Sequence, residues 1–216
     1  MMSREQTIRL NICLACQLLD EFLVSKPMVK RLILLVIISV LPLLLFAHGS
    51  HGNGVMSGFT HPIFGFDHAV AIFGAGVLAY LINPSRWYIS VAAFVGAMII
   101  GGLFGIGNEA TVMVEKAIAS SVLIIGILIM LRKRLNLPIV VFLLAIFGVF
   151  HGYAHGAEMD PENTALKYVS GYTLGAFLMG TIGMLAAKVI NMLNNELVFT
   201  IVGAIISALG VMILLG

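Results

Sequence analysis

The sequence predicts an all-α integral membrane protein, with six transmembrane helices behind an N-terminal signal peptide and therefore seven hydrophobic segments in all. Of its 216 residues, 60% are hydrophobic and only 10% are charged, and the mean hydropathy is +1.08. Soluble domains carry roughly 25% charged residues. The apolar residues form continuous runs of about 20 residues, the length of one helical crossing, and not the alternating pattern of a barrel. The net charge of +2 does not indicate a nucleic-acid partner.

The N-terminal part of the chain is distinct from the membrane domain. Residues 28–47 read MVKRLILLVIISVLPLLLFA, which is the three-part pattern of a secretory signal peptide: basic residues, an apolar run and a small residue. An uncleaved anchor helix is the alternative, because the apolar run is slightly long. We expect Met28 to be the physiological start and residues 1–27 to be a non-native extension. Cys13 and Cys16 lie in that extension, and a single Cys-x-x-Cys pair without a second one does not predict a redox or zinc site.

Six apolar spans follow the leader within the predicted membrane domain, residues 48–216. The expected spans are 62–82, 87–107, 110–131, 137–156, 166–189 and 196–216. Pro84, Pro138 and Pro161 lie at breaks between spans or in first turns, because proline cannot continue a helix. The 23 glycines suit close packing of helices in lipid.

The distribution of charged residues assigns a side of the membrane to each connection. Alternate connections carry the basic residues, namely Arg86, Arg132, Lys133, Arg134 and Lys188. The remaining connections carry acidic residues, namely Glu109, Glu158, Asp160 and Glu162. The positive-inside rule places the basic connections in the cytoplasm, and a cleaved leader independently places residue 48 outside. We therefore expect a multi-pass protein of the bacterial inner membrane with both mature termini in the periplasm.

Two histidines and an aspartate stand at the outer end of the first span, in FTHPIFGFDHAVAIFGAG. Titratable groups in hydrocarbon cost several kcal/mol, so they usually have a function or a partner. We expect His61 to cap a helix that begins at Pro62, so that His68, two turns later, points in the same direction as His61. Asp67 is rotated by about 100° from His68 on such a helix. It ligates a metal if the helix is distorted near Gly65, and otherwise it orients an imidazole.

A second polar patch, FHGYAHGAE, ends the fourth span on the same side. His151 and His155 are four residues apart, so their imidazoles share one helix face and can hold one ion. Glu158 lies three residues further on, within reach of that face. Gly152 and Gly156 follow the histidines and leave room for a close neighbour or for local unwinding. Mixed imidazole and carboxylate ligands suit nickel, cobalt and zinc better than calcium or magnesium, so the patches predict a divalent transition-metal site.

Three further residues are candidate additional ligands. His48 and His51, in HGSHGNG, either join the site once the leader is removed or belong to a flexible polar leader. Glu115, within the third span, is a ligand, a proton-coupled carboxylate or the partner of the adjacent lysine. Glu109 is expected to be a solvated loop acid. The sequence indicates no catalytic residues.

At its two histidine motifs the sequence resembles the HupE/UreJ family of nickel/cobalt permeases. The resemblance rests on His-Pro-x-x-Gly-x-Asp-His at 61–68, on Phe-His-Gly-x-Ala-His-Gly-x-Glu at 150–158, and on a leader that ends just before an Ala-His-Gly segment. It implies secondary transport of Ni²⁺ or Co²⁺ from the periplasm into the cytoplasm, with residues 48–216 as the transporter domain. By matching positions, the expected metal-handling residues are His61, Asp67, His68, His151, His155 and Glu158.

The resemblance implies a transporter and not an enzyme, with the ion as substrate and no permanently bound cofactor. The expected partners are the metal ion, for which Zn²⁺ is a further candidate, and the lipid bilayer. No glycine-rich phosphate-binding loop is present, so the energy is expected to come from gradients or from trapping of the metal in the cell. One alternative is a membrane-embedded zinc-dependent hydrolase, although the sequence has no His-Glu-x-x-His. A haem-carrying electron-transfer subunit is another, although these histidines are shallow and lie beside acids.

Overall fold

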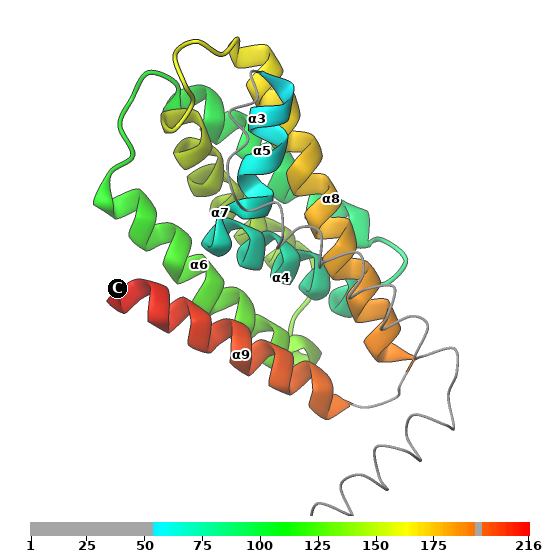
Figure 1. Cartoon of the computed structure of the whole chain (residues 1–216). Helices are drawn as coiled ribbons and strands as arrows, with labels where there is room; N and C mark the ends of the chain where they lie inside the picture. The colour runs from blue at the N-terminus through cyan, green and yellow to red at the C-terminus, as the bar shows by residue number, and fades with distance from the viewer. Residues whose placement is uncertain (1–53, 193–195) are drawn as a thin grey trace, which may run out of the picture. The chain divides into compact units, whose positions relative to one another are not determined.

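The computed structural model describes residues 54–192 and 196–216, and every regular element in these ranges is helical (Figure 1). The elements are α3 (Val55–Phe64), α4 (Phe66–Ile82), α5 (Trp87–Gly105), α6 (Val112–Met130), the short 3-10 helix η1 (Arg132–Arg134), α7 (Leu137–Ala157), α8 (Ala165–Asn191) and α9 (Glu196–Leu215). The all-α fold class is therefore confirmed for this part of the chain. The predicted extension 1–27, the predicted signal peptide 28–47, His48 and His51 lie outside the described residues.

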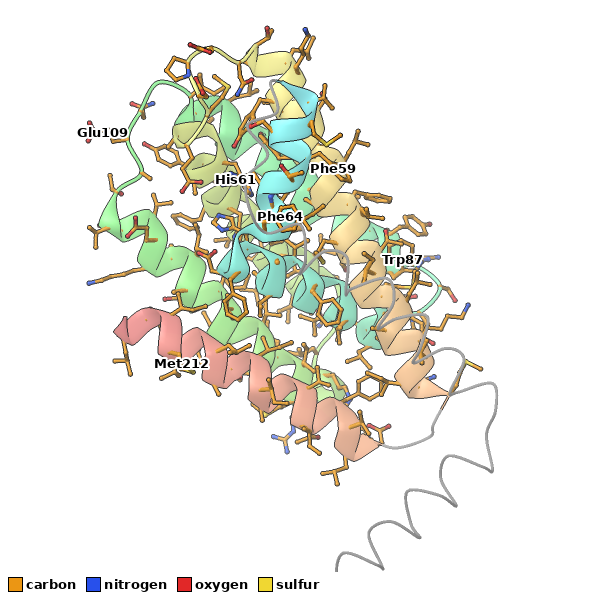
Figure 2. All side chains as sticks on the ribbon, in the orientation of Figure 1. Phe59, His61, Phe64, Trp87, Glu109 and Met212 are labelled. Carbon is orange, nitrogen blue, oxygen red and sulfur yellow. The ribbon has the colours of Figure 1, made fainter. Side chains whose placement is uncertain are left out.

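Five of the described helices, α5 to α9, are long and apolar enough to cross a membrane, and the bent pair α3–α4 brings the number to six. The bounds of these five helices agree with the expected spans to within two residues at each end. Large apolar side chains are exposed on the surface of the bundle, among them Leu103 and Phe142. Met212, on α9, is another (Figure 2). Such an outer surface suits contact with lipid, and the chain is a multi-pass membrane protein.

The first span differs from its prediction, because it is two helices and not one. α3 and α4 meet at an angle of 79° around Gly65, whose φ of −67° and ψ of 106° are extended. α3 begins at Val55, so Pro62 lies inside it, and the expectations of Pro62 as first residue and His61 as cap are wrong. In the part of α3 that precedes His61, Gly58 packs closely on α8: a Cβ there would lie 2.1 Å from the Tyr168 carbonyl oxygen. Proline cannot donate a backbone hydrogen bond, and α3 ends shortly after Pro62.

Closely packed helix pairs build the bundle. α5 packs along α7, α6 lies beside α9, and α8 packs along both α3 and α4 (Figure 1). Glycines allow the close approach: a Cβ on Gly152 would lie 2.0 Å from the Met98 carbonyl oxygen, and one on Gly101 would lie 2.0 Å from that of Val149. Small residues at such contacts let helix backbones meet in lipid. The fit of α7 against α5 also fixes the histidines that neighbour the α7 glycines.

Basic residues tie the other end of the bundle together. The Arg132 guanidinium donates hydrogen bonds to the backbone carbonyls of Ile129 at 3.2 Å and of Glu196 at 3.1 Å. It also forms an ion pair with the Glu196 carboxylate and lies 5.3 Å above the ring of Phe199. Lys133 approaches the same carboxylate at 3.5 Å. These contacts join the start of α9 to the connection between α6 and α7.

Candidate metal centre

Four histidines from three helices form one cluster, which joins the two motifs of the sequence. His61 lies on α3, His68 in the first turn of α4, and His151 and His155 near the end of α7. The ring centroids of His155 and His61 are 4.9 Å apart, those of His155 and His68 are 4.6 Å apart, and those of His68 and His151 are 5.2 Å apart. We refer to these four residues as the histidine cluster.

The break at Gly65 changes how the two histidines of the first motif approach each other. His61 and His68 were expected to lie two turns apart on one helix, and this expectation is wrong because they belong to different helices. Their rings nevertheless face each other edge to face, with centroids 6.2 Å apart. The 79° bend, and not helical periodicity, brings them together.

Glu158 and His61 form the exposed end of the cluster. The His61 Nε2–H donates a hydrogen bond to Glu158 Oε2 at 2.6 Å, and the two side chains are 34% and 42% exposed. With His155 they offer three ligand atoms that all lie within 4.8 Å of one another. Burial raises the pKa of the Glu158 carboxyl, but the hydrogen bond from His61 and the charges of His61 and His68 outweigh burial and lower the pKa below its ordinary value. Glu158 is therefore a carboxylate at neutral pH.

His68 and His151 form the buried end of the cluster, and each ring is oriented by a hydrogen bond to an oxygen atom. The Nδ1–H of His68 donates to Asp67 Oδ1 at 2.8 Å, and the Nδ1 of His151 donates to the Phe147 carbonyl at 2.9 Å. When the ring is neutral, Nδ1 carries its proton in both residues, and Nε2 then carries a lone pair. Among the described residues, neither Nε2 atom has a hydrogen-bond partner, and both are buried. This is the arrangement that metal-binding histidines adopt, with the second nitrogen hydrogen-bonded to an oxygen.

Asp67 was expected either to ligate or to orient an imidazole. Its Oδ1 accepts the ring N–H of His68 and also the backbone N–H of His68, at 2.9 Å. The geometry therefore matches the orienting alternative, although the helix is broken near Gly65 as the ligating alternative required.

His155 lies between the two ends and differs from the other histidines of the cluster. It is fully buried, and neither Nδ1 nor Nε2 has a hydrogen-bond partner among the described residues. Its ring stacks on Tyr172 of α8, with centroids 5.3 Å apart and an interplanar angle of 15°. Tyr168, one turn earlier on α8, places its ring 6.4 Å from that of His61. Neither tyrosine was singled out from the sequence, where two hydroxyl groups four residues apart on an apolar helix were the available signal.

A cavity of about 670 Å³ opens beside the exposed end of the cluster. Its polar lining consists of His61, Asp67, His68, Glu115, Lys116 and Glu158. Glu115 on α6 therefore shares the cavity with the two carboxylates of the motifs. Glu109 is exposed on the connection between α5 and α6 and lies away from His61 (Figure 2), as expected for a solvated acid.

Comparison with known proteins finds a family whose matched region includes both histidine motifs. The profile of the HupE / UreJ protein family matches residues 35–213. Protein HupE of Rhizobium leguminosarum bv. viciae is 30% identical over 177 residues, which cover 82% of this chain and 93% of that protein. No solved structure matches the chain. The chain belongs to the HupE/UreJ family.

Proposed function

We propose that the chain is a secondary transporter that carries Ni²⁺ or Co²⁺ from the periplasm into the cytoplasm through the histidine cluster. The observation that carries this proposal is the set of unpartnered buried nitrogens: Nε2 of His68, Nε2 of His151 and both ring nitrogens of His155. A buried polar atom without a partner costs about 1–3 kcal/mol. A divalent ion that binds the lone pairs would offset this cost at several rings together. Membership of a family of membrane transporters favours transport over the hydrolase alternative.

The exposed end of the cluster is suited to capture. The carboxylates of Glu158, Asp67 and Glu115 line the cavity, so a hydrated cation meets negative charge before it meets the imidazoles. Binding between His61 and Glu158 replaces the proton that these two groups share, because a ligating nitrogen must be deprotonated. Capture at this end therefore exchanges a proton for a metal ion.

The buried end is suited to selection. Magnesium and calcium prefer oxygen ligands and, for magnesium, retain several waters, whereas imidazole suits nickel and cobalt. The rings of His68 and His151 are 7% and 0% exposed, so an ion that reaches them exchanges water for nitrogen. No cysteine lies in the described residues, and imidazoles release these metals more readily than thiolates do. The ion can therefore leave toward the cytoplasm.

The charges at the two ends of the bundle support the orientation in the membrane that we propose. Acidic side chains line the cavity, while Arg132, Lys133 and the other basic connection residues lie at the opposite ends of the same helices. By the positive-inside rule the cavity faces the periplasm. We include in the proposal the inner membrane as location, both mature termini in the periplasm and a cleaved leader at 28–47.

Uptake of radioactive metal tests the proposal. Cells that express the wild-type chain should accumulate Ni²⁺ or Co²⁺, each competing with the other, and not accumulate Mg²⁺. His155→Ala and His68→Ala should reduce uptake to the background of cells without the protein. Glu109→Gln, an exposed acid on the same side, is the matched control and should transport like the wild type. Equal membrane levels, measured by immunoblot, separate loss of transport from loss of protein. Wild-type uptake that equals the background for both metals would refute the proposal.

A further inference from the structure

His155 is the histidine of the cluster whose orientation has no hydrogen bond to explain it. His61, His68 and His151 are held by Glu158, Asp67 and the Phe147 carbonyl. His155 has no such partner among the described residues, yet its ring lies between those of His61 and His68. A ligand that is free to rotate loses the convergence with its neighbours on which binding depends. Some other contact must therefore set the plane of this ring.

Tyr172 provides that contact. Its ring lies nearly parallel to the His155 imidazole, at 15°, whereas the rings of His61 and His68 meet His155 at 79° and 52°. With centroids 5.3 Å apart, the two rings are offset, so Tyr172 covers part of one face of the imidazole and opposes rotation of the ring. Tyr172 is itself fully buried, so it has little room to move.

The Tyr172 ring is in turn anchored to a third helix. Its hydroxyl donates a hydrogen bond to the Met98 carbonyl oxygen of α5 at 3.3 Å. The hydroxyl fits because Gly102, one turn further along α5, has no side chain: a Cβ there would lie 2.0 Å from the Tyr172 hydroxyl oxygen. The chain of contacts thus runs from α5 through Tyr172 on α8 to His155 on α7.

We propose that Tyr172 is a positioning residue that holds the His155 imidazole in its metal-binding orientation, in the space that Gly102 leaves open. This inference rests on the proposed function, since it concerns the same metal. The ring of Tyr172 does the positioning, and the hydroxyl only anchors the ring. Removal of the hydroxyl and removal of the ring therefore have different consequences, and this difference separates positioning from general packing.

Binding of Co²⁺ to the purified full chain in detergent tests the inference, because the d–d absorption of cobalt reports the number and geometry of its ligands. Tyr172→Phe keeps the stacked ring and should retain the wild-type spectrum, with an affinity within about threefold of the wild type. Tyr172→Leu should bind Co²⁺ about 10- to 100-fold more weakly, the usual effect of losing a group that orients a ligand, and should give an altered spectrum. Phe199→Leu removes an equally buried aromatic ring beside Arg132 and is the matched control, with an unchanged spectrum.

A second pair of variants gives a result that a purely structural role does not produce. Gly102→Ala pushes the Tyr172 hydroxyl away and should weaken Co²⁺ binding. In Gly102→Ala combined with Tyr172→Phe the 2.0 Å contact with the hydroxyl is removed, but the contact with the ring carbon Cζ at 2.9 Å stays. Affinity and spectrum should therefore recover only part of the way toward the wild type. These two variants also test the positioning role if Tyr172→Leu does not fold.

The outcomes separate the inference from the proposed function. A wild-type spectrum and affinity in folded Tyr172→Leu, or unchanged Co²⁺ binding in folded Gly102→Ala, would overturn the positioning role while leaving the metal site in place. Absence of Co²⁺ and Ni²⁺ binding by the wild-type chain would overturn the proposed function, and the inference with it.

Discussion

His61 Nε2 and Glu158 Oε2 lie 2.6 Å apart, although 97 positions separate them in the sequence. The contact joins α3 to the end of α7, so it connects the first histidine motif to the last residue of the second. Both side chains are partly exposed at the cavity, where an arriving ion meets them before the buried rings. Neither motif forms the exposed end of the cluster by itself.

Replacement of Glu158 should therefore affect capture of the metal. Glu158→Gln keeps the size of the side chain and removes its charge, and we expect the Kd for Ni²⁺ to rise about 10- to 100-fold. Isothermal titration of the purified protein measures the change. Glu109→Gln, which removes an exposed acid outside the cavity lining, should leave the Kd unchanged. Equal affinities of the two variants would argue against Glu158 as a ligand.

Metal binding should weaken as the pH is lowered from 7.5 to 5.5. The pKa of Glu158 is lowered, so its carboxylate stays ionised across this range and does not cause the change. A nitrogen that binds metal must be free of its proton, so protons compete with the ion at the His61–Glu158 pair. The Kd for Ni²⁺ should rise with each unit of acidification. Glu158→Gln should show a shallower slope than the wild type, because His61 loses the carboxylate with which it shares a proton. A Kd that does not depend on pH would argue against the exchange of a proton for the metal ion at the His61–Glu158 pair.

The tether of His68 gives a graded prediction. Asp67→Ala removes the acceptor of the His68 Nδ1–H, so the ring loses its fixed tautomer and orientation, and Ni²⁺ affinity should fall about 10- to 100-fold. Asp67→Asn retains an oxygen acceptor but not the charge, and its affinity should lie between those of Asp67→Ala and the wild type. If Asp67→Asn binds as weakly as Asp67→Ala, the charge of Asp67 or direct ligation matters more than the tether.

Close packing of α5 and α7 should make the bundle sensitive to a single methyl group. A Cβ on Gly152 would meet the Met98 carbonyl oxygen at 2.0 Å, and backbone atoms cannot move aside without separating the helices. Gly152→Ala should therefore destabilise the protein by about 1–3 kcal/mol or more. Gly96→Ala, also on α5, meets nothing within 4 Å and should be neutral or slightly stabilising. Thermal unfolding in detergent compares the two variants, and similar melting temperatures would contradict the packing that we describe.

The long helices were predictable because lipid imposes a simple requirement on the sequence. A crossing helix needs an unbroken apolar run of about 20 residues, so the bounds of α5 to α9 follow closely from hydrophobicity and from the charged connections. The meeting of the two motifs was also predictable, since the alternation of spans places both on one side. His61, His68, His151, His155 and Glu158 do gather there, and their ligation of metal stays a prediction.

The details that the sequence did not predict depend on how the helices pack against one another. Helical periodicity places His61 and His68 on one face, but it contains no information about a bend at Gly65, which depends on how α3 packs against α8. The stacking of Tyr172 on His155 requires three helices to be in place, because α5 anchors the ring and α7 supplies its partner. By contrast, the hydrogen bond from His151 to the Phe147 carbonyl spans one helical turn. It depends on one helix only, so the local sequence was enough to predict it.

The position of the two motif carboxylates sets the electrostatic profile of the path that we propose for the metal ion. Asp67 and Glu158 carry together two negative charges at the exposed side of a cluster of neutral imidazoles, which equals the charge of one divalent cation. An ion held among them forms an electrically neutral assembly. Beyond His151 the ion leaves both countercharges behind, so in a medium of low dielectric constant its energy rises with depth. For the transport that we propose, the barrier to passage is thus electrostatic, and a membrane potential that is negative inside would lower it.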